Sequence, residues 1–426
     1  MTNISVPLLG MVDTAVLGHL NGPSYLAGVA LGGAIFNMLF IGMNFLRMGT
    51  TGIAAQAFGQ QNAVALRETL WQAIIVALCL ASTMVLLQVP IGELSWRLLD
   101  GGIAAETEAA RYFYIRIWSA PATLINFVLI GWFIGLQKTR VPLVMVVTTN
   151  AVNIVLDLLL VVGIGMKTDG VAIATVCGEY LGMFVGLAYV IKTLRLWPGR
   201  ARREQLFKAA SYQRFLAVNG NILIRTLALV GTIVFVTAQG ATFGETVLAA
   251  NAILMNLQYL LSYGLDGLAH AAEALVGSAW GKRQIDALKK AVTLTMRWSL
   301  LVAAGFTILF LLFGRALIGL LTDIEDVQQT AITYLPWLIA SPLISVFSFV
   351  MDGVFIGLTW STDMRNIMLA SALFVFAPVW WLTQAYGNHG LWFAFTVFMA
   401  SRGIGMMLAY RYRLKSTATA NWLKNA

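Results

Sequence analysis

Four polar side chains lie inside long apolar stretches of this sequence, where each needs a partner or a function. Asp13 falls in the stretch Pro7–Leu20, Asn153 and Asp157 fall in a later stretch, and Thr175 falls in the next one. A charged Asp in such a stretch costs about 2.5 kcal/mol or more on membrane-insertion scales, so it is expected to face protein or water. We therefore expect these side chains to handle an ion or a proton.

Asn153 and Asp157 are four residues apart, so a helix presents both on one face. Thr175 adds a hydroxyl that can donate or accept a hydrogen bond. Together with Asp13 they offer carboxylate, amide and hydroxyl oxygens, which suit a hard cation such as Na⁺ or a bound proton. Two plainer readings stay open: Asp13 can lie in the head-group region at a helix end, and the other three can form a helix-packing network worth about 0.6 kcal/mol per contact. No metal is expected beyond Na⁺ at these same oxygens.

The elements that must position these residues are membrane helices. The chain has 426 residues, of which 59% are hydrophobic and 11% charged, and its mean hydropathy is +0.79. A helical span needs about 20 mostly apolar residues, and long apolar segments joined by short loops favour a helical bundle over a barrel. We predict an all-α polytopic membrane protein with twelve transmembrane segments, near residues 3–20, 27–52, 69–92, 112–136, 141–165, 170–191, 213–238, 248–277, 291–314, 331–357, 367–386 and 389–410.

The net charge of +9 does not indicate nucleic-acid binding, because the basic residues follow the positive-inside rule. They gather in the loops after even-numbered segments and in the tail, as Arg67, Lys138, Arg140, Lys192, Arg195, Arg200, Arg202, Arg203, Lys282, Arg283, Lys289, Lys290, Arg365, Arg411 and Arg413. The opposite loops are richer in acids. Both termini are therefore expected to be cytoplasmic, in a bacterial-type inner membrane, and the basic clusters can also contact anionic lipids.

Several other classes of function are not supported. Cys79 and Cys177 lie within apolar segments, which is typical of packing residues rather than of a disulfide framework or a metal cluster. No nucleophile and base recur together near the scattered histidines, so an enzyme is not expected. Gly281-Lys282 lacks the other residues of a phosphate-binding loop, so an ion gradient is expected to drive the protein, without a cofactor. The first segment is short before His19, and a few further turns of helix are expected upstream.

The sequence repeats itself. Ala57-Phe58-Gly59 and Ala279-Trp280-Gly281 close similar segments at an offset of 279 − 57 = 222 residues, and Phe133-Ile134-Gly135-Leu136 recurs as Phe355-Ile356-Gly357-Leu358 at the same offset. We predict two six-helix lobes, residues 1–195 and 213–426, joined by a basic cytoplasmic linker at 196–212. Six spans in each lobe give both lobes the same orientation, so their pseudo-two-fold axis is expected along the membrane normal.

The two halves differ at the residues that could do chemistry. At the same offset Asp13 falls on Phe235, and the polar run that begins at Asn150 and ends at Asp157 falls on the apolar run Ala372–Pro378. Packing alone does not require this difference. We therefore place the ion or proton site in the first lobe.

Five stretches carry a resemblance to a known family: VDTAVLGHL at 12–20, FLRMGTTGIAAQAFG at 45–59, NIVLDLLLVVGIGM at 153–166, GVAIATV at 170–176 and LDGLAHAAEALVG at 265–277. They resemble the multidrug and toxic compound extrusion (MATE) transporters, most closely their DNA-damage-inducible F (DinF) branch. The resemblance implies two six-helix lobes that export amphipathic, often cationic compounds in exchange for H⁺ or Na⁺. It also implies a cation site in the first lobe whose residues match Asp13, Asn153, Asp157 and Thr175. Other branches carry an acid in helix seven for a second site, but Arg225 stands in that stretch here, so a second cation site is not expected.

Further charges lie inside the predicted segments, and their roles stay open. Asp266 and Asp352 each precede a Gly. They can line a central cavity together with Arg225 and attract cationic compounds, or they can form structural ion pairs with Arg225 and Arg402, because buried ion pairs are weak evidence of function. Glu179 can reach water from either lobe.

We expect proton-coupled antiport of small amphipathic compounds by a monomer that contacts membrane lipids. The counts of 17 Met, 23 Phe and 13 Trp suit an adaptable cavity for varied cargo. The rival function is that of a lipid-intermediate flippase with a similar two-lobed fold, which would use intramembrane cations such as Arg47, Arg116, Arg225 and Arg402 to hold a pyrophosphate head group. A receptor that transports nothing leaves the intramembrane acids without a purpose.

Overall fold

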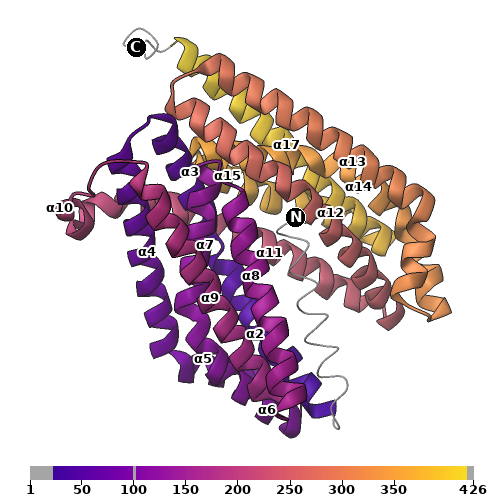
Figure 1. The fold of residues 1–426 in the computed structure, drawn as a ribbon. Coiled ribbons are helices and arrows are strands. Elements are labelled where there is room, and N and C mark those ends of the chain that lie inside the picture. Colours follow the sequence, from indigo (N-terminus) through magenta and orange to yellow (C-terminus); the bar gives the residue numbers. More distant parts are fainter. Residues whose placement is uncertain (1–22, 99–101, 420–426) are drawn as a thin grey trace. The chain divides into compact units, whose positions relative to one another are not determined.

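The computed structural model describes residues 23–98 and 102–419, which are almost entirely helical (Figure 1). The first half contains α2 (Pro23–Met43), α3 (Phe45–Gly59), α4 (Ala63–Leu86), α5 (Gln88–Leu98), α6 (Ile103–Arg116), α7 (Ala120–Gly135), α8 (Arg140–Asp157) and α9 (Thr168–Arg195). The second half contains α10 (Arg203–Phe207), α11 (Ala209–Thr242), α12 (Glu245–Gly281), α13 (Ile285–Leu321), α14 (Glu325–Leu358), α15 (Ser361–Ala370), α16 (Ala377–Thr383) and α17 (Asn388–Thr419). The 3-10 turns η2 (Ile117–Ser119) and η5 (Gln384–Tyr386) and the π turns η3 (Leu158–Gly163) and η4 (Ser371–Phe376) link or extend these helices. No strand occurs in the described residues, and the predicted all-α class is confirmed.

Ten helical stretches within the described ranges are long and apolar enough to cross a membrane. Each predicted segment from the second onward coincides with one of these stretches or with the long helix α12, which is not among the ten. The predicted polytopic membrane class is therefore confirmed. The first predicted segment, which carries Asp13, lies outside the described residues.

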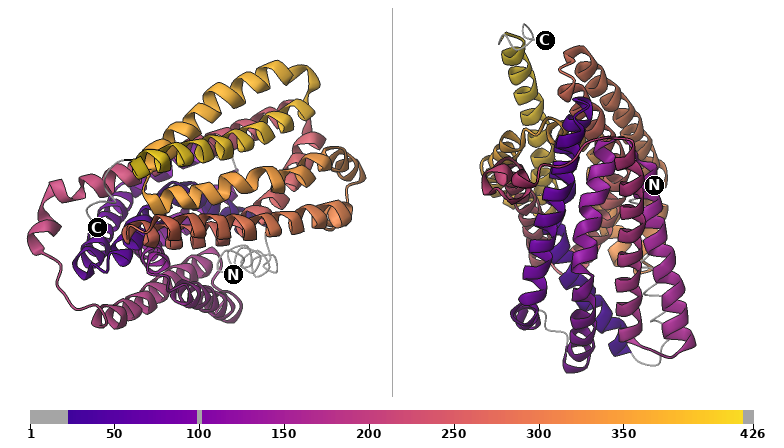
Figure 2. Two further views of the ribbon diagram at one scale, coloured as in Figure 1. Left: turned by 90° about the horizontal axis from the view of Figure 1, so that it is seen from above. Right: turned by 60° about the vertical axis from the view of Figure 1, so that its left-hand side comes forward.

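Contacts within the chain divide it into two compact units, Met1–Leu216 and Ala217–Ala426. Within each unit long helices run side by side, as the two views in Figure 2 show. The boundaries expected for the two lobes and the linker stay a prediction.

Each unit contains a helix crossing, at matching positions of the repeat, at which backbones touch. In the first unit α7 lies against α3, and a Cβ added at Gly131 would meet the Arg47 backbone, with the carbonyl carbon only 3.0 Å away. In the second unit α14 lies against α12, and a Cβ added at Gly353 would be 3.0 Å from the same atom of Ala269. Both residues of the second pair follow those of the first at the offset found in the sequence.

A second glycine repeats the contact one turn later. A Cβ at Gly135 would lie 2.8 Å from the Thr51 carbonyl oxygen, and one at Gly357 would lie 2.6 Å from the Glu273 carbonyl oxygen. Two small residues four apart let membrane helices approach at backbone distance. The repeated Phe-Ile-Gly sequence thus marks the same helix crossing in each unit. The crossing joins α3 and α7 in the first unit and α12 and α14 in the second.

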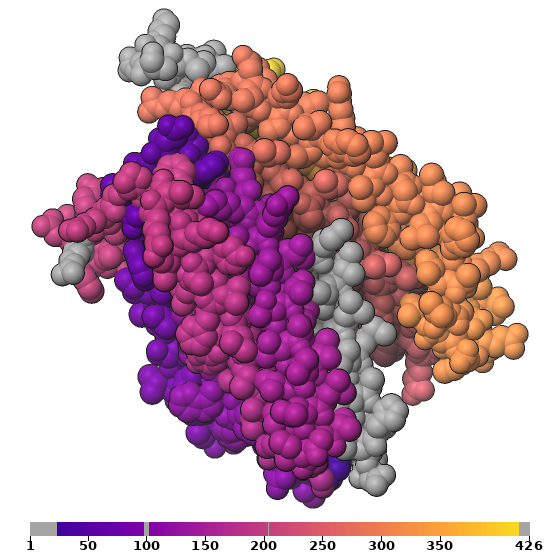
Figure 3. All heavy atoms as spheres, in the orientation of Figure 1, coloured from indigo at the N-terminus to yellow at the C-terminus, as the bar shows by residue number. Residues whose placement is uncertain are grey.

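The surface of the first unit formed by α8 and α9 is apolar. These two helices, purple and magenta, form the near face of the unit in Figure 3. Val147 and Val155 of α8 and Phe184 and Ile191 of α9 are exposed. Such a surface suits contact with lipid, whereas Asn153, Asp157 and Thr175 of the same two helices are buried in the interior of the unit.

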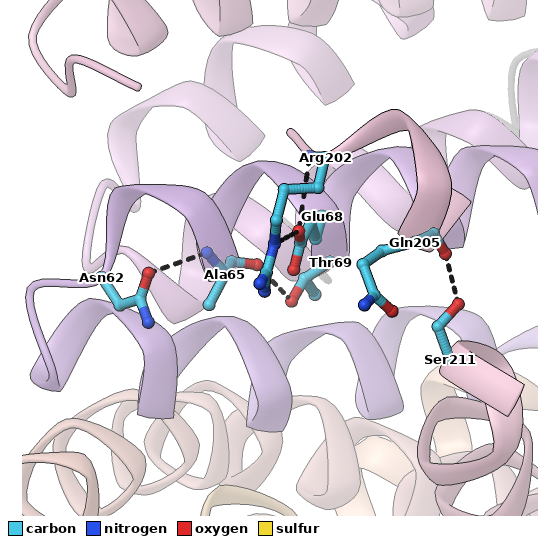
Figure 4. A network of polar contacts seen from close by, with 7 residues as sticks. All are labelled: Asn62, Ala65, Glu68, Thr69, Arg202, Gln205 and Ser211. Atoms are coloured by element: carbon cyan, nitrogen blue, oxygen red, sulfur yellow. Dashed lines mark hydrogen bonds and ion pairs between the residues drawn. The ribbon is translucent and has the colours of Figure 1, made fainter. Parts of the chain in front are cut away.

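The start of α4 holds the basic segment that follows α9 (Figure 4). Asn62 caps α4, because its side-chain oxygen accepts a hydrogen bond from the Ala65 N–H at 3.0 Å. Glu68, two turns into the helix, accepts a hydrogen bond from Arg202 Nε at 3.0 Å. That hydrogen bond and the charge of Glu68 raise the pKa of Arg202 above its usual value. The segment with α10 therefore folds back onto the first unit.

Candidate functional site

The predicted site depends on how closely α8 and α9 approach each other. A Cβ added at Gly178 of α9 would lie 2.8 Å from the Thr149 carbonyl oxygen of α8. Gly182, one turn later, faces the Thr149 hydroxyl with no room for a side chain. Asn153 follows Thr149 by one turn, and Thr175 precedes Gly178 by one turn. The glycines of α9 thereby bring these two polar side chains within reach of each other.

Asn153, Asp157 and Thr175 form one buried cluster. Their exposed fractions are 1%, 0% and 3%. When the Asn153 amide is oriented to suit a charged carboxylate, Nδ2 donates to Asp157 Oδ2 at 3.0 Å and Oδ1 accepts from Thr175 N and Oγ1, both at 3.2 Å. The Thr175 hydroxyl can alternatively donate to the Val171 carbonyl at 2.9 Å. The structure thus brings together three of the four predicted residues, and the fourth, Asp13, lies outside the described residues.

Asp157 also marks a change in helix geometry. α8 ends at Asp157 and continues as the π turn η3, in which the Ile164 N–H donates to the Leu159 carbonyl at 2.9 Å. The fifth helix of the second half has a π turn too, η4, but its residues are Ser-Ala-Leu-Phe-Val-Phe. Single π turns inside α-helices are frequent at functional sites. Only the first unit combines such a turn with a carboxylate among the described residues.

A second polar cluster follows on α9, one turn beyond Thr175. Glu179 is half-buried there, and its Oε2 accepts a hydrogen bond from Asn126 Nδ2 of α7 at 2.8 Å. The same Nδ2 donates to the Glu179 carbonyl at 3.0 Å. Asn126 Oδ1 and the Ser119 hydroxyl, on the same face of the helix, are buried without a hydrogen-bond partner among the described residues. Atoms of this kind are commonly satisfied by water, so the polar region extends beyond the predicted site.

In the second unit Asp352 pairs with two arginines. Its Oδ2 accepts from Arg225 Nη2 of α11 and, at 2.8 Å, from Arg402 Nη2 of α17. The sequence had left two roles open for Asp352, and the structure shows the ion pairs. Asp266 lies half-buried in α12. At the repeat offset the counterpart of Asp352 is Ile130, so this charged group belongs to the second unit alone.

Metal binding by protein acids, histidines or cysteines has no support in the described ranges. No three such side chains between residues 23 and 98 or between 102 and 419 lie close enough to hold a metal ion. The oxygens of Asn153, Asp157 and Thr175 come from three different groups, and a cation there would need further ligands.

Comparisons with known proteins agree with this architecture. The MatE family profile matches residues 1–159 and 222–382. The chain is 42% identical over 413 residues to DNA damage-inducible protein F of Escherichia coli (strain K12), covering 96% of this chain and 89% of the relative. It is 24% identical over 413 residues to the probable multidrug resistance protein NorM of Bacillus anthracis, covering 94% of this chain and 90% of that one. A crystal structure of MATE in the bent conformation superposes with a TM-score of 0.89 at 19% identity, over 97% of this chain and 93% of the other, which shows a shared fold. The chain therefore belongs to the MatE family of multidrug and toxic compound extrusion (MATE) transporters.

Proposed function

We propose that this protein is a secondary antiporter that exports small amphipathic, often cationic compounds in exchange for H⁺, with Na⁺ as the alternative coupling ion. The coupling site would consist of Asp13, Asn153, Asp157 and Thr175. The observation that carries the proposal is the complete burial of Asp157 beside an amide and a hydroxyl in the interior of a membrane protein.

The Asn153 amide can form a hydrogen bond with Asp157 whether the Asp157 carboxyl group is charged or protonated. When the carboxylate is charged, Nδ2 faces Asp157 Oδ2 at 3.0 Å and Oδ1 faces Thr175. When the carboxyl is protonated, the amide can turn by half a rotation, so that Oδ1 accepts the carboxyl proton and Nδ2 donates to Thr175 Oγ1 at 3.2 Å. Both states then keep the hydrogen bonds that join Asp157 Oδ2, the Asn153 amide and Thr175.

Proton uptake and release at the Asp157 carboxyl group, beside this amide, would link the ion to the cargo. Uptake from outside neutralises Asp157, Asp13 or both, and this change reshapes the interior of the first unit so that the cargo leaves. Release of the proton toward the cytosol restores the charged state. Na⁺ would bind the same oxygens in place of the proton.

The experiment is uptake of a fluorescent cationic dye into inside-out vesicles under either a pH gradient or a Na⁺ gradient. We expect uptake driven by the pH gradient that is lost in Asp157→Asn and in Asp13→Asn. Asp326→Asn is the matched control, because Asp326 is an exposed acid at the start of α14. Full uptake in both site variants would overturn the coupling site, and uptake driven by Na⁺ alone would change the ion.

The flippase function is the second candidate, and the arginine pair on Asp352 favours it. A flippase would use Arg225 and Arg402 to hold a phosphate head group. It predicts no dye uptake under either gradient by folded protein, together with movement of a fluorescent lipid phosphate that is lost in Arg402→Gln. The dye assay therefore separates the two functions.

A further inference from the structure

The second unit contains a buried group of charges that do not balance. Arg225, Asp352 and Arg402, which we name the arginine triad, have exposed fractions of 7%, 7% and 3%. Both guanidinium groups donate to one oxygen, Asp352 Oδ2. Two positive charges therefore share one negative charge inside the unit.

The arginine triad also has hydrogen-bonding atoms that lack a partner. Arg225 Nε, Arg402 Nε and Asp352 Oδ1 are all buried without a partner among the described residues. The other contacts of Arg402 are weak ones, to the Met399 sulfur at 3.2 Å and to the Phe398 ring at 5.5 Å. A buried charge without compensation is strongly unfavourable. A group that accepts hydrogen bonds and carries negative charge would satisfy the two arginines, while Asp352 Oδ1 needs a donor such as water.

Further polar side chains lie between the triad and the start of α15. Asn221 lies one turn before Arg225 on α11, and its side-chain oxygen accepts from Arg365 Nη1 at 2.8 Å. Its Nδ2 faces the hydroxyls of Ser361 and Thr362 at 3.2 and 3.1 Å. Arg365 is half-exposed. A third guanidinium and two hydroxyl groups thus lie about one turn of α11 from the triad and add to the positive potential there.

We propose that the arginine triad is an anion-binding site, which takes the carboxylate or phosphate of a small molecule. The oxygens of the anion accept hydrogen bonds from Arg225 Nε and Arg402 Nε, and its charge balances the pair that Asp352 balances only in part. Asp352 limits the affinity for the anion, because its Oδ2 already accepts hydrogen bonds from Nη2 of both arginines. Binding does not depend on the proposed antiport. Only the further step, that cargo with an acidic group is exported, rests on it.

The test is the unfolding temperature of the full-length protein in detergent, with 1-naphthoate as the probe and the neutral 1-naphthamide as its control. Chloride, phosphate and micelles with an anionic lipid are added separately, to tell an organic acid from an inorganic anion or a lipid. We expect naphthoate to raise the unfolding temperature and naphthamide to leave it unchanged. A response to chloride or phosphate alone would confirm the site with an inorganic anion as its ligand, and a response to the lipid alone would overturn the small-molecule assignment.

Charge variants of the triad make the test specific. Arg225→Gln balances the charges and removes one donor, so the naphthoate affinity should fall by about tenfold or more. Asp352→Asn removes the negative charge and so increases the surplus of positive charge in the triad. The naphthoate affinity should therefore rise. A purely structural triad predicts that both variants unfold earlier and that neither changes the response to naphthoate. Arg225→Lys keeps the charge but removes the Nε donor, so it should weaken the naphthoate response less than Arg225→Gln does. It serves if Arg225→Gln does not fold, because a purely structural triad predicts an unchanged response.

Three results would overturn the proposal: no response to any anion in the parent protein, an equal response in Arg225→Gln, or a response abolished by Asp352→Asn. Arg315→Gln, at an exposed arginine of α13, is the control for general charge effects. Failure of the antiport proposal would show in the dye assay and would leave the naphthoate response intact. The two proposals therefore fail independently.

Discussion

Replacing Gly357 by Ala tests whether the repeated helix crossing holds the second unit together. The added Cβ would lie 2.6 Å from the Glu273 carbonyl oxygen and 2.9 Å from the Gly277 nitrogen, whereas ordinary contact begins at 3.4 Å. Both neighbours are backbone atoms of α12, so no change of rotamer can relieve the contact. The helices must separate by 3.4 − 2.6 = 0.8 Å along this line.

The cost follows from two opposing effects. Over-packing that shifts the backbone costs about 1–3 kcal/mol, and Ala favours a helix over Gly by about 1 kcal/mol. The net loss is then about 0–2 kcal/mol, which lowers the unfolding temperature of a unit of this size by up to about 8 °C. Thermal unfolding of the purified protein in detergent, followed by tryptophan fluorescence, measures this shift.

Two further variants control the comparison. Gly135→Ala makes the corresponding contact in the first unit, 2.8 Å from the Thr51 carbonyl oxygen, and should lower the unfolding temperature as well. Gly305→Ala places a Cβ in open space on α13, so the helix preference alone should raise the unfolding temperature. If Gly357→Ala proves as stable as Gly305→Ala, then backbone contact does not hold this crossing and the reasoning is wrong.

Three other changes have expected outcomes. Gly178→Ala would place a Cβ 2.8 Å from the Thr149 carbonyl oxygen and push α8 away from α9, so pH-driven dye uptake should fall while the protein still inserts and unfolds cooperatively; unchanged uptake would show that the spacing of α8 and α9 does not matter. Asn126→Leu removes the only N–H that the described residues direct at the Glu179 carboxylate, so it should destabilise the protein by about 1–3 kcal/mol. Glu179→Gln in the same background should restore part of the lost stability. No loss of stability in Asn126→Leu would contradict the contact. Burial lowers the pKa of Lys138 in the folded protein from 10.5. Between the two pKa values the unfolded chain binds more protons than the folded one, so stability rises with pH, and the unfolding temperature of the parent should rise relative to that of Lys138→Met as the pH approaches 10.5. Parallel plots of unfolding temperature against pH for the two proteins would refute this.

The cluster on α8 and α9 could be anticipated because helix periodicity is local. Asn153 and Asp157 share a face by spacing alone, and an acid in an apolar segment already requires an interior position. The repeat was also visible, since Gly135 and Gly357 stand in the same short motif. What the sequence could not show is that this motif is the place where two backbones meet.

The partners of Asp352 and Glu179 could not be chosen from the sequence. Asp352 is 127 residues from Arg225 and 50 residues from Arg402, so their meeting depends on how α11, α14 and α17 pack. Asn126 and Thr123 are isolated polar residues in an otherwise apolar helix, and nothing in the local sequence marks Asn126 as the hydrogen-bond partner of Glu179. Pairing between distant helices is a property of packing, and no periodicity within one helix encodes it.

The π turn after Asp157 has a mechanical consequence. A π turn holds one residue more than the helix needs, and it can travel along the helix one residue at a time without breaking it. Each step rotates the residue it passes by about 100°, the angle between successive residues of an α-helix. One step toward the start of α8 would turn Asp157 away from Asn153, while the glycine-locked pair α3 and α7 stayed fixed. The first unit thus places its buried carboxylate at the point of α8 where such a step would rotate it.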